Sequence, residues 1–149
     1  MNETLLKQIE SIIDPSLPLV SNLSNVSAIL YKMEKLNWAG FYLVNGDNLY
    51  LGPFQGDVAC TIIGKGKGVC GTAFEKKETI VVGDVNEFKG HIACSSLSKS
   101  EIVTPILLNN EVVAVIDIDS PIYNRFSLDD KAFLETVSKM LSPLFKNGK

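Results

Sequence analysis

Three cysteines are the residues of this chain best suited to redox chemistry: Cys60, Cys70 and Cys94. An odd number of cysteines argues against a fixed disulfide framework and leaves thiol chemistry or metal binding open. The alternative is that all three are small hydrophobic residues of the core, where free cysteine is often found. The residue type therefore predicts a thiol site without deciding its chemistry.

Cys94 lies within a long irregular segment, residues 83–100, between two predicted strands. Segments of that length in a compact domain commonly carry function. A reactive thiol must be ionised, which nearby helix N-terminal amides or a cationic His91 would favour, and the sequence reveals neither. A thiol oxidised to sulfenic acid is resolved by a second thiol. Cys60 and Cys70 are the candidates, and the glycine-rich stretch between them predicts a backbone free to carry a sulfur.

Two carboxylates lie two residues apart at the end of a predicted strand, Asp117 and Asp119. Because strand side chains alternate between faces, both share a face with Val113 and Val115. The opposite face then carries Ala114, Ile116 and Ile118. This pattern predicts a polar pocket beside the sheet. A strand end that runs into solvent, with a turn at Asp119-Ser120-Pro121, is the alternative.

Trp38, Gly40 and Tyr42 alternate in the same way on an earlier predicted strand. An indole and a phenol on one face, with a glycine between them, could leave a slot for a methyl group. Aromatic residues on strands are also common in ordinary cores, and the sequence leaves both interpretations open.

Two further patterns are weaker. The stretch Gly66-Lys67-Gly68-Val69-Cys70-Gly71 has the spacing of a dinucleotide-binding loop. The helix predicted after it is too short, however, and the acid at Asp84 comes too early. Cys60, Cys70, His91 and Cys94 could form a zinc set, although they lack the paired Cys-x-x-Cys spacing of zinc knuckles.

Apolar periodicity predicts the elements that must position these residues. Helical spacing runs from Leu5 to Ile13 and from Leu23 to Leu36, and a closing helix is predicted over 128–145 with Ser127 as its N-cap. Two hairpins are predicted over 38–52 and 101–118, with turns at Asn45-Gly46-Asp47 and Asn109-Asn110. Short strands are predicted over 61–63 and 79–82, with a short helix between them. Hairpin strands pair antiparallel, and the terminal helices can cover one face, which predicts an α+β fold.

Composition predicts one globular domain over residues 1–149, because 46% of the residues are hydrophobic and 21% are charged. A net charge of -3 and a pI of about 5.1 argue against nucleic acid or an anionic membrane as partner. The N-terminal residues lack the basic start and apolar stretch of a signal peptide, and no apolar segment reaches about 18 residues. We therefore expect a cytoplasmic protein.

Six motifs in a fixed order resemble those of the free methionine-(R)-sulfoxide reductases, which have the GAF fold. They are Asn37-Trp38-Ala39-Gly40-Phe41-Tyr42, Leu51-Gly52-Pro53-Phe54-Gln55-Gly56, Gly66-Lys67-Gly68-Val69-Cys70-Gly71, Gly90-His91-Ile92-Ala93-Cys94, Ser100-Glu101-Ile102-Val103 and Asp117-Ile118-Asp119-Ser120-Pro121. The resemblance runs from about residue 38 to residue 133. Lys89 and Ser95 stand where many relatives have proline and an acid, and neither difference removes a reacting group.

The resemblance implies a GAF-like central antiparallel sheet, with the N-terminal and C-terminal helices on one face. Cys94 matches the family's catalytic cysteine. Cys60 matches the thiol that usually forms a disulfide with it, and Cys70 matches a third cysteine that can assist. Trp38 and Tyr42 match the aromatic wall against which the substrate methyl group packs. The acidic cluster around the substrate is matched by Glu101, Asp117 and Asp119.

The same resemblance implies reduction of the free amino acid, L-methionine-(R)-sulfoxide, to methionine through sulfenic acid and disulfide intermediates. No cofactor and no metal are expected, and thioredoxin is the expected external reductant. A homodimer is implied as well. The competing hypothesis is a non-catalytic GAF sensor that binds a small ligand and passes a signal to a partner.

Overall fold

The computed structural model describes residues 2–90 and 97–146. In chain order the elements are α1 (Asn2–Ile12), α2 (Leu19–Leu30), β1 (Trp38–Asn45), β2 (Asn48–Gly56), β3 (Ile62–Gly64), α3 (Gly68–Lys76), β4 (Ile80–Val82), a 3-10 turn (Val85–Glu87), β5 (Ser100–Leu108), β6 (Glu111–Ser120), α4 (Leu128–Leu141) and a second 3-10 turn (Ser142–Phe145). The strands form one six-stranded sheet in the order β3-β2-β1-β6-β5-β4. Every neighbouring pair is antiparallel, which confirms both predicted hairpins.

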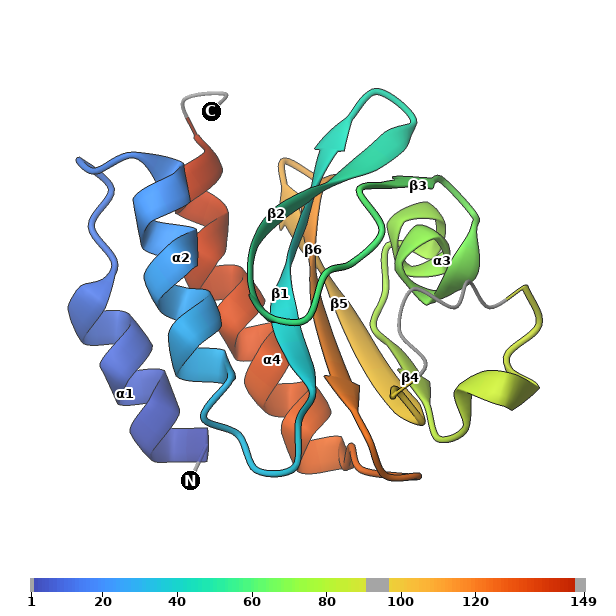
Figure 1. Ribbon diagram of the computed structural model, residues 1–149. Helices are drawn as coiled ribbons and strands as arrows, with labels where there is room; N and C mark the ends of the chain where they lie inside the picture. Colours follow the sequence, from blue (N-terminus) through green and yellow to red (C-terminus); the bar gives the residue numbers. More distant parts are fainter. Residues whose placement is uncertain (1, 91–96, 147–149) are drawn as a thin grey trace.

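Helices cover the two faces of the sheet unequally. Helices α1, α2 and α4 pack on one face, and α3 lies on the other together with the segments around it (Figure 1). The three-helix side holds the larger apolar core, to which β6 contributes Ala114, Ile116 and Ile118. A smaller core on the α3 side includes Val115, Trp38 and Tyr42. The α+β prediction is confirmed, and the α3 face is where the acidic residues of β6 emerge.

Helix α2 ends at Leu30, earlier than the apolar spacing indicates. The chain turns at Tyr31, and Lys35 adopts a left-handed conformation with φ 61°. Met33 is nevertheless buried at 3% exposure. The helical spacing of Met33 relative to Leu30 and Ile29 therefore results from its burial in the core and not from continuation of the helix.

A β-bulge in the second hairpin corrects one detail of the predicted alternation. The pairing of β5 with β6 shifts between Ile106 and Leu107, so that Leu107 faces Val112. A bulge moves the following side chain to the other face of the sheet. Val112 therefore belongs to the core beside α3, and Val113 packs on the three-helix side. The prediction that Val113 shares a face with Asp117 was wrong for this reason.

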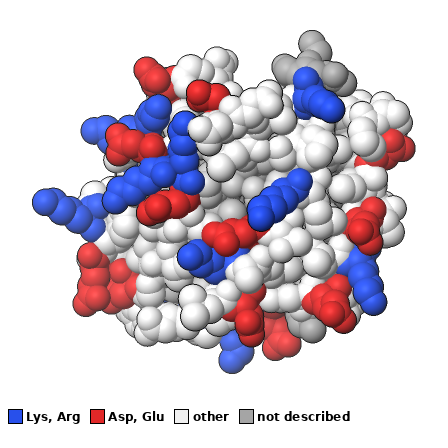
Figure 2. Space-filling view, turned by 180° about the vertical axis from the view of Figure 1, so that it is seen from behind, with Lys and Arg blue, Asp and Glu red and all other residues white. Residues whose placement is uncertain are grey.

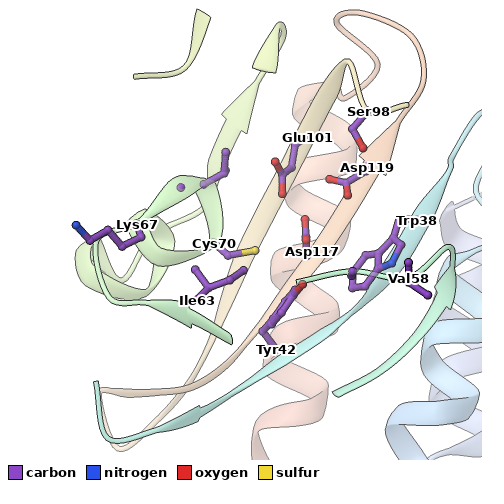
Figure 3. Close-up of a pocket in the computed structure, with 13 residues that line it drawn as sticks. Trp38, Tyr42, Val58, Ile63, Lys67, Cys70, Ser98, Glu101, Asp117 and Asp119 are labelled. Carbon is purple, nitrogen blue, oxygen red and sulfur yellow. The ribbon is translucent and has the colours of Figure 1, made fainter. Parts of the chain in front are cut away.

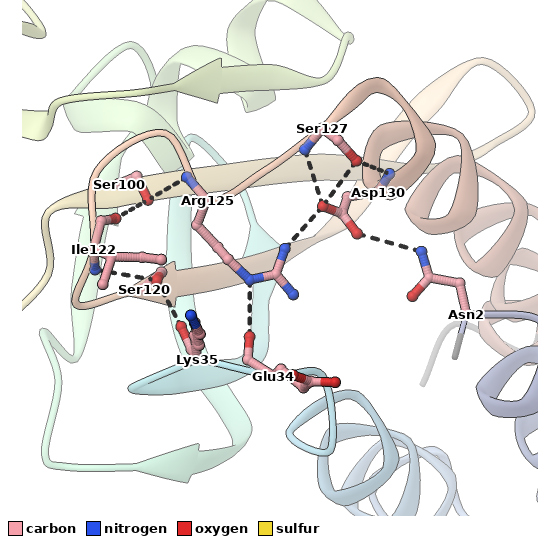
Figure 4. Close-up of polar contacts among 9 residues, drawn as sticks. All are labelled: Asn2, Glu34, Lys35, Ser100, Ser120, Ile122, Arg125, Ser127 and Asp130. Carbon is pink, nitrogen blue, oxygen red and sulfur yellow. Dashed lines mark hydrogen bonds and ion pairs between the residues drawn. The ribbon is translucent and has the colours of Figure 1, made fainter.

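The N-terminus of α4 is fixed by a capping box. The Ser127 hydroxyl accepts a hydrogen bond from the Asp130 amide at 3.2 Å, and the Ser127 amide donates to the Asp130 carboxylate at 2.9 Å. This confirms Ser127 as the N-cap. Arg125 forms an ion pair with Asp130 at 3.0 Å, and Asn2 of α1 donates to the same carboxylate at 3.3 Å (Figure 4).

Two serines pin the ends of the central strands. The Ser100 hydroxyl donates to the Ile122 carbonyl at 2.6 Å, and the Ser120 hydroxyl donates to the Lys35 carbonyl at 2.6 Å (Figure 4). Both serines are fully buried. Because Glu101 follows one of them directly in the sequence and Asp119 precedes the other, these hydrogen bonds restrain the backbone that carries the acidic residues.

Charged side chains of both signs are interleaved on the face seen from behind Figure 1 (Figure 2). Within residues 2–90 and 97–146, no helix combines the length and the apolar character needed to cross a bilayer.

Candidate active site

Strand register places a tryptophan and two acidic residues in one row across the sheet, with a third acid beside them. Trp38 of β1 lies opposite Asp119 of β6, and Asp119 lies opposite Glu101 of β5. Asp117 is two residues earlier on β6 and pairs with Gly40. Residues paired in this way project on the same side of the sheet at close range. Antiparallel pairing thus brings the acidic residues of β5 and β6 together and places the tryptophan of β1 beside them.

These residues open into a pocket between the sheet, the start of α3 and the loop that follows β2 (Figure 3). Its empty volume, which includes open solvent at the mouth, is about 540 Å³. The lining comprises Trp38, Tyr42, Val58, Ala59, Ile63, Lys67, Gly68, Val69, Cys70, Ser98, Glu101, Asp117 and Asp119. The pocket therefore combines aromatic surface, carboxylates and a thiol. All five predicted substrate-binding residues line it.

Burial and mutual repulsion favour protonation of the acidic cluster. Glu101 is 8% exposed and Asp117 is 5% exposed. Burial, followed by the charges of Asp117 and Asp119, raises the pKa of Glu101 well above its usual range. Burial and the charge of Asp117 likewise raise the pKa of Asp119, although hydrogen bonds from Glu101 and Ser98 oppose that shift. The cluster can therefore retain a proton at neutral pH and still attract a cation.

Cys70 lies in the first turn of α3 and points toward Asp117 (Figure 3). Its sulfur and the carboxylate oxygens of Glu101 and Asp117 all lie within 4.8 Å of one another. Burial and then the charge of Asp117 raise the pKa of the Cys70 thiol. A thiol held protonated in this way is a weak nucleophile. Cys70 is thus suited to the pocket wall more than to the attack on a substrate.

The glycine-rich stretch before Cys70 is packed and hydrogen-bonded, contrary to the predicted freedom of its backbone. The Gly66 amide donates to the Gly71 carbonyl, and the Gly71 amide donates to the Lys67 carbonyl, both at 2.9 Å. A side chain at Gly71 would collide with the Gly64 carbonyl. These glycines allow a close approach of backbone to backbone and fix Cys70 in the helix.

Trp38 and Tyr42 form an aromatic wall on one face of β1, as predicted. Their ring centroids are 5.9 Å apart, and Phe54 stacks on Trp38 at 5.1 Å. The expected slot at Gly40 is absent from this wall, because a side chain there would collide with Phe54. Gly40 instead permits the close approach of β2, whose register shifts at this point.

Of the two remaining predicted thiols, one lies in the described part of the chain. Cys60 is half-buried in the loop between β2 and β3, next to the pocket-lining Ala59. Cys94 and His91 lie outside the described residues. Two of the four residues of the zinc set considered from the sequence are therefore outside the described part of the chain, and Cys70 has Glu101 and Asp117 as neighbours.

Sequence reasoning missed one polar contributor, Ser98. Its hydroxyl accepts a hydrogen bond from the Asn37 side chain at 3.1 Å and is hydrogen-bonded to Asp119. The backbone N–H of Asn37 also donates to the backbone carbonyl of Asp119 at 3.0 Å. The position of Ser98 four residues after Cys94 was an available signal. Its role depends on a contact between segments that the sequence does not display.

Replacing Glu101 with glutamine is expected to stabilise the fold at neutral and alkaline pH. Because the pKa of Glu101 is raised in the folded protein, the folded state binds more protons than the unfolded state between the two pKa values. The free energy of unfolding therefore falls as pH rises through that window. Glu101→Gln should raise Tm by about 2–6 °C at pH 8 relative to the wild type, measured by calorimetry.

The matched control is Glu111→Gln, at an exposed position at the start of β6. Its Tm difference from the wild type should vary little with pH. The Glu101→Gln difference should shrink as the pH falls below 4.5, the usual pKa of a glutamate, because Glu101 is then neutral in both the unfolded and the folded state. A pH-independent difference for Glu101→Gln would contradict the assignment of a buried, repelled carboxyl.

The fold and the pocket define the class of this protein. The chain matches the GAF domain family over residues 9–143 and belongs to it. Free methionine-R-sulfoxide reductase of Saccharomyces cerevisiae is 47% identical over 149 residues, which cover 94% of this chain and 83% of the yeast protein. The Escherichia coli protein of the same name is 46% identical over 123 residues, covering 82% of this chain and 74% of that protein.

A solved structure agrees with this placement. The X-ray structure of free methionine-R-sulfoxide reductase from Neisseria meningitidis, in complex with its substrate, superposes with a TM-score of 0.93 at 43% identity. The match covers 97% of this chain and 88% of that chain. Within the GAF fold, the chain therefore belongs to the free methionine-R-sulfoxide reductases.

Proposed function

We propose that this protein reduces free L-methionine-(R)-sulfoxide to methionine, with Cys94 as the nucleophile. The observation that carries the proposal is the pocket in which an aromatic wall faces a cluster of three carboxyl groups, of which Glu101 and Asp117 are buried and Asp119 is half-buried. Free methionine sulfoxide offers its ammonium group to carboxylates and its methyl group to aromatic rings. The pocket supplies both partners, carboxyl groups and aromatic rings, in a chain whose relatives are methionine sulfoxide reductases.

The chemistry divides the work between the thiol and the acids. The Cys94 thiolate attacks the sulfoxide sulfur, and the departing oxygen takes a proton from the acidic cluster. The protonated oxygen then migrates from the substrate sulfur to the Cys94 sulfur as the bond between the two sulfurs breaks, which releases methionine and leaves Cys94 as sulfenic acid. The raised pKa of Glu101 and of Asp119 supports the cluster as the proton source.

Recycling consumes the sulfenic acid. The Cys60 thiol condenses with it, so that a disulfide forms and water leaves. A dithiol reductant of the thioredoxin type then reduces the disulfide and restores both thiols. Cys60 suits this step better than Cys70, because its loop lies at the pocket edge next to the exposed Val58, whereas Cys70 is buried in a helix. The net reaction converts sulfoxide and dithiol to methionine, water and disulfide.

A stereospecific turnover assay tests the proposal. The purified protein is mixed with free methionine sulfoxide of either diastereomer, thioredoxin, thioredoxin reductase and NADPH, and NADPH loss is followed. We expect steady oxidation of NADPH with the R diastereomer and only background oxidation with the S diastereomer. Binding without turnover would overturn the proposal and favour a GAF sensor.

Replacing Cys60 with serine is expected to limit the protein to a single turnover. Pre-reduced Cys60→Ser should release about one methionine per chain and then stop, because serine cannot condense with the sulfenic acid. Methionine released in the presence and absence of thioredoxin provides the measurement. Cys70→Ser is the comparison: if that variant stops after one turnover and Cys60→Ser does not, Cys70 is the recycling thiol.

A further inference from the structure

The loop between β2 and β3 is tied to the aromatic wall at two points. Residues 57–61 lie outside any helix or strand and carry Cys60. The Trp38 indole Nε1 donates to the Asp57 carbonyl at 3.0 Å, and the Tyr42 hydroxyl donates to the Cys60 carbonyl at 2.9 Å. Each aromatic side chain that lines the pocket therefore also holds the backbone of the loop by one hydrogen bond.

Burial and stacking restrain both donors. Tyr42 is 2% exposed and Trp38 is 3% exposed, and both lie in the smaller core beside α3. They are on the same face of β1, and their stacked planes differ by only 24°. A stacked, buried ring leaves its polar tip little freedom, so the hydrogen bonds fix the positions of the Asp57 and Cys60 carbonyls.

The Tyr42 hydroxyl is a permanent donor at this position. Burial, and then the charge of Asp117, raise the pKa of Tyr42, so the phenol keeps its proton throughout the working pH range. The Thr61 carbonyl, on the other side of Cys60, accepts a hydrogen bond from the Leu51 amide at 3.0 Å. The backbone at Cys60 is thereby held at two successive carbonyls, its own and that of Thr61.

We propose that Tyr42, besides contributing its ring to the pocket wall, is the positioning residue for the recycling thiol. Its hydroxyl holds the backbone of Cys60 at the pocket edge, where the thiol can reach a sulfenic acid formed in the pocket. This inference rests on the proposed function. The step affected is the condensation in which the thiol of Cys60 displaces water from sulfenic acid and forms the disulfide.

The test removes the hydroxyl and keeps the ring. Pre-reduced Tyr42→Phe is mixed with one equivalent of free methionine-R-sulfoxide and no reductant. Methionine release and disulfide closure are followed separately by acid quenching and mass spectrometry, with a 1,3-diketone probe to trap sulfenic acid. We expect the closure rate constant to fall about five- to tenfold, and more trapped sulfenic acid per methionine formed.

Tyr50→Phe is the matched control, because Tyr50 is a partly exposed tyrosine on the neighbouring strand β2. Its closure rate constant should stay within about twofold of the wild type. Hydrogen exchange of a peptide spanning residues 55–62 provides a second readout, and it should quicken in Tyr42→Phe alone. Closure and exchange that match the wild type would overturn the inference. Failure of the wild type to release methionine would instead overturn the proposed function.

Discussion

Replacing Cys94 with serine is expected to reduce methionine formation by at least about a thousandfold. A serine hydroxyl is not ionised at neutral pH, and it cannot accept oxygen from a sulfoxide as a thiolate does. Pre-reduced Cys94→Ser should therefore release no methionine above background, even in a single turnover. The released amino acid is quantified against the wild type after rapid quenching.

The substitution must be shown to leave the fold intact. Thermal unfolding and binding of methionine-R-sulfoxide by calorimetry provide that control, and both should remain measurable because Glu101, Asp117 and Asp119 are retained. Cys60→Ser differs in the same assay, since it should complete its first turnover. A Cys94→Ser variant with normal steady-state rates would show that another group attacks the substrate.

Replacing Asp119 with asparagine is expected to lower kcat/KM by about 10²- to 10³-fold. Asparagine keeps the shape of the side chain, but it cannot carry negative charge or donate an acidic proton. Asp119 is opposite both Trp38 and Glu101 in the sheet, so its loss affects recognition of the ammonium group and the sharing of a proton within the cluster. Steady-state kinetics over a range of substrate concentrations separate these effects into KM and kcat.

The Asp119→Asn substitution should also shift the dependence of kcat on pH in a definite direction. If a neutral acid of the cluster protonates the departing oxygen, wild-type kcat falls as pH rises through the raised pKa of the cluster. Loss of the Asp119 charge relieves repulsion on Glu101, which moves that decline toward lower pH. Asp47→Asn, in the exposed turn between β1 and β2, should leave the profile unchanged. Wild-type kinetics in Asp119→Asn would exclude Asp119 from the site.

Much of the fold was predictable from local patterns. The hairpin turns and the capping box at Ser127 involve residues within a few positions of one another, so their signals are contiguous in the sequence. The bulge that moves Val113 to the other face was not predictable, because it depends on how β5 and β6 align. The end of α2 at Leu30 was not predictable either, because the apolar spacing continues to residues that are buried without being helical. Met33 is buried by the core and not by a helical turn.

The candidate site was predictable as a set of residues. The motifs identified the aromatic wall and the three acids, and the structure brings all five into one pocket. The role of Gly40 was misread, because the sequence does not show that Phe54 of the neighbouring strand fills the space beside it. Ser98 was missed because its partners, Asn37 and Asp119, come from distant segments.

Residue chemistry and local order in the sequence thus established which groups are available and which family they belong to. The three-dimensional arrangement decided their electrostatic state: Glu101, Asp117 and Asp119 acquire their mutual repulsion only where β5 and β6 pair and exclude water. It also decided that Cys70 is a buried thiol and that Cys60 is tied to Tyr42. Burial and distance between segments are properties of the folded chain, and no pattern of neighbouring residues encodes them directly.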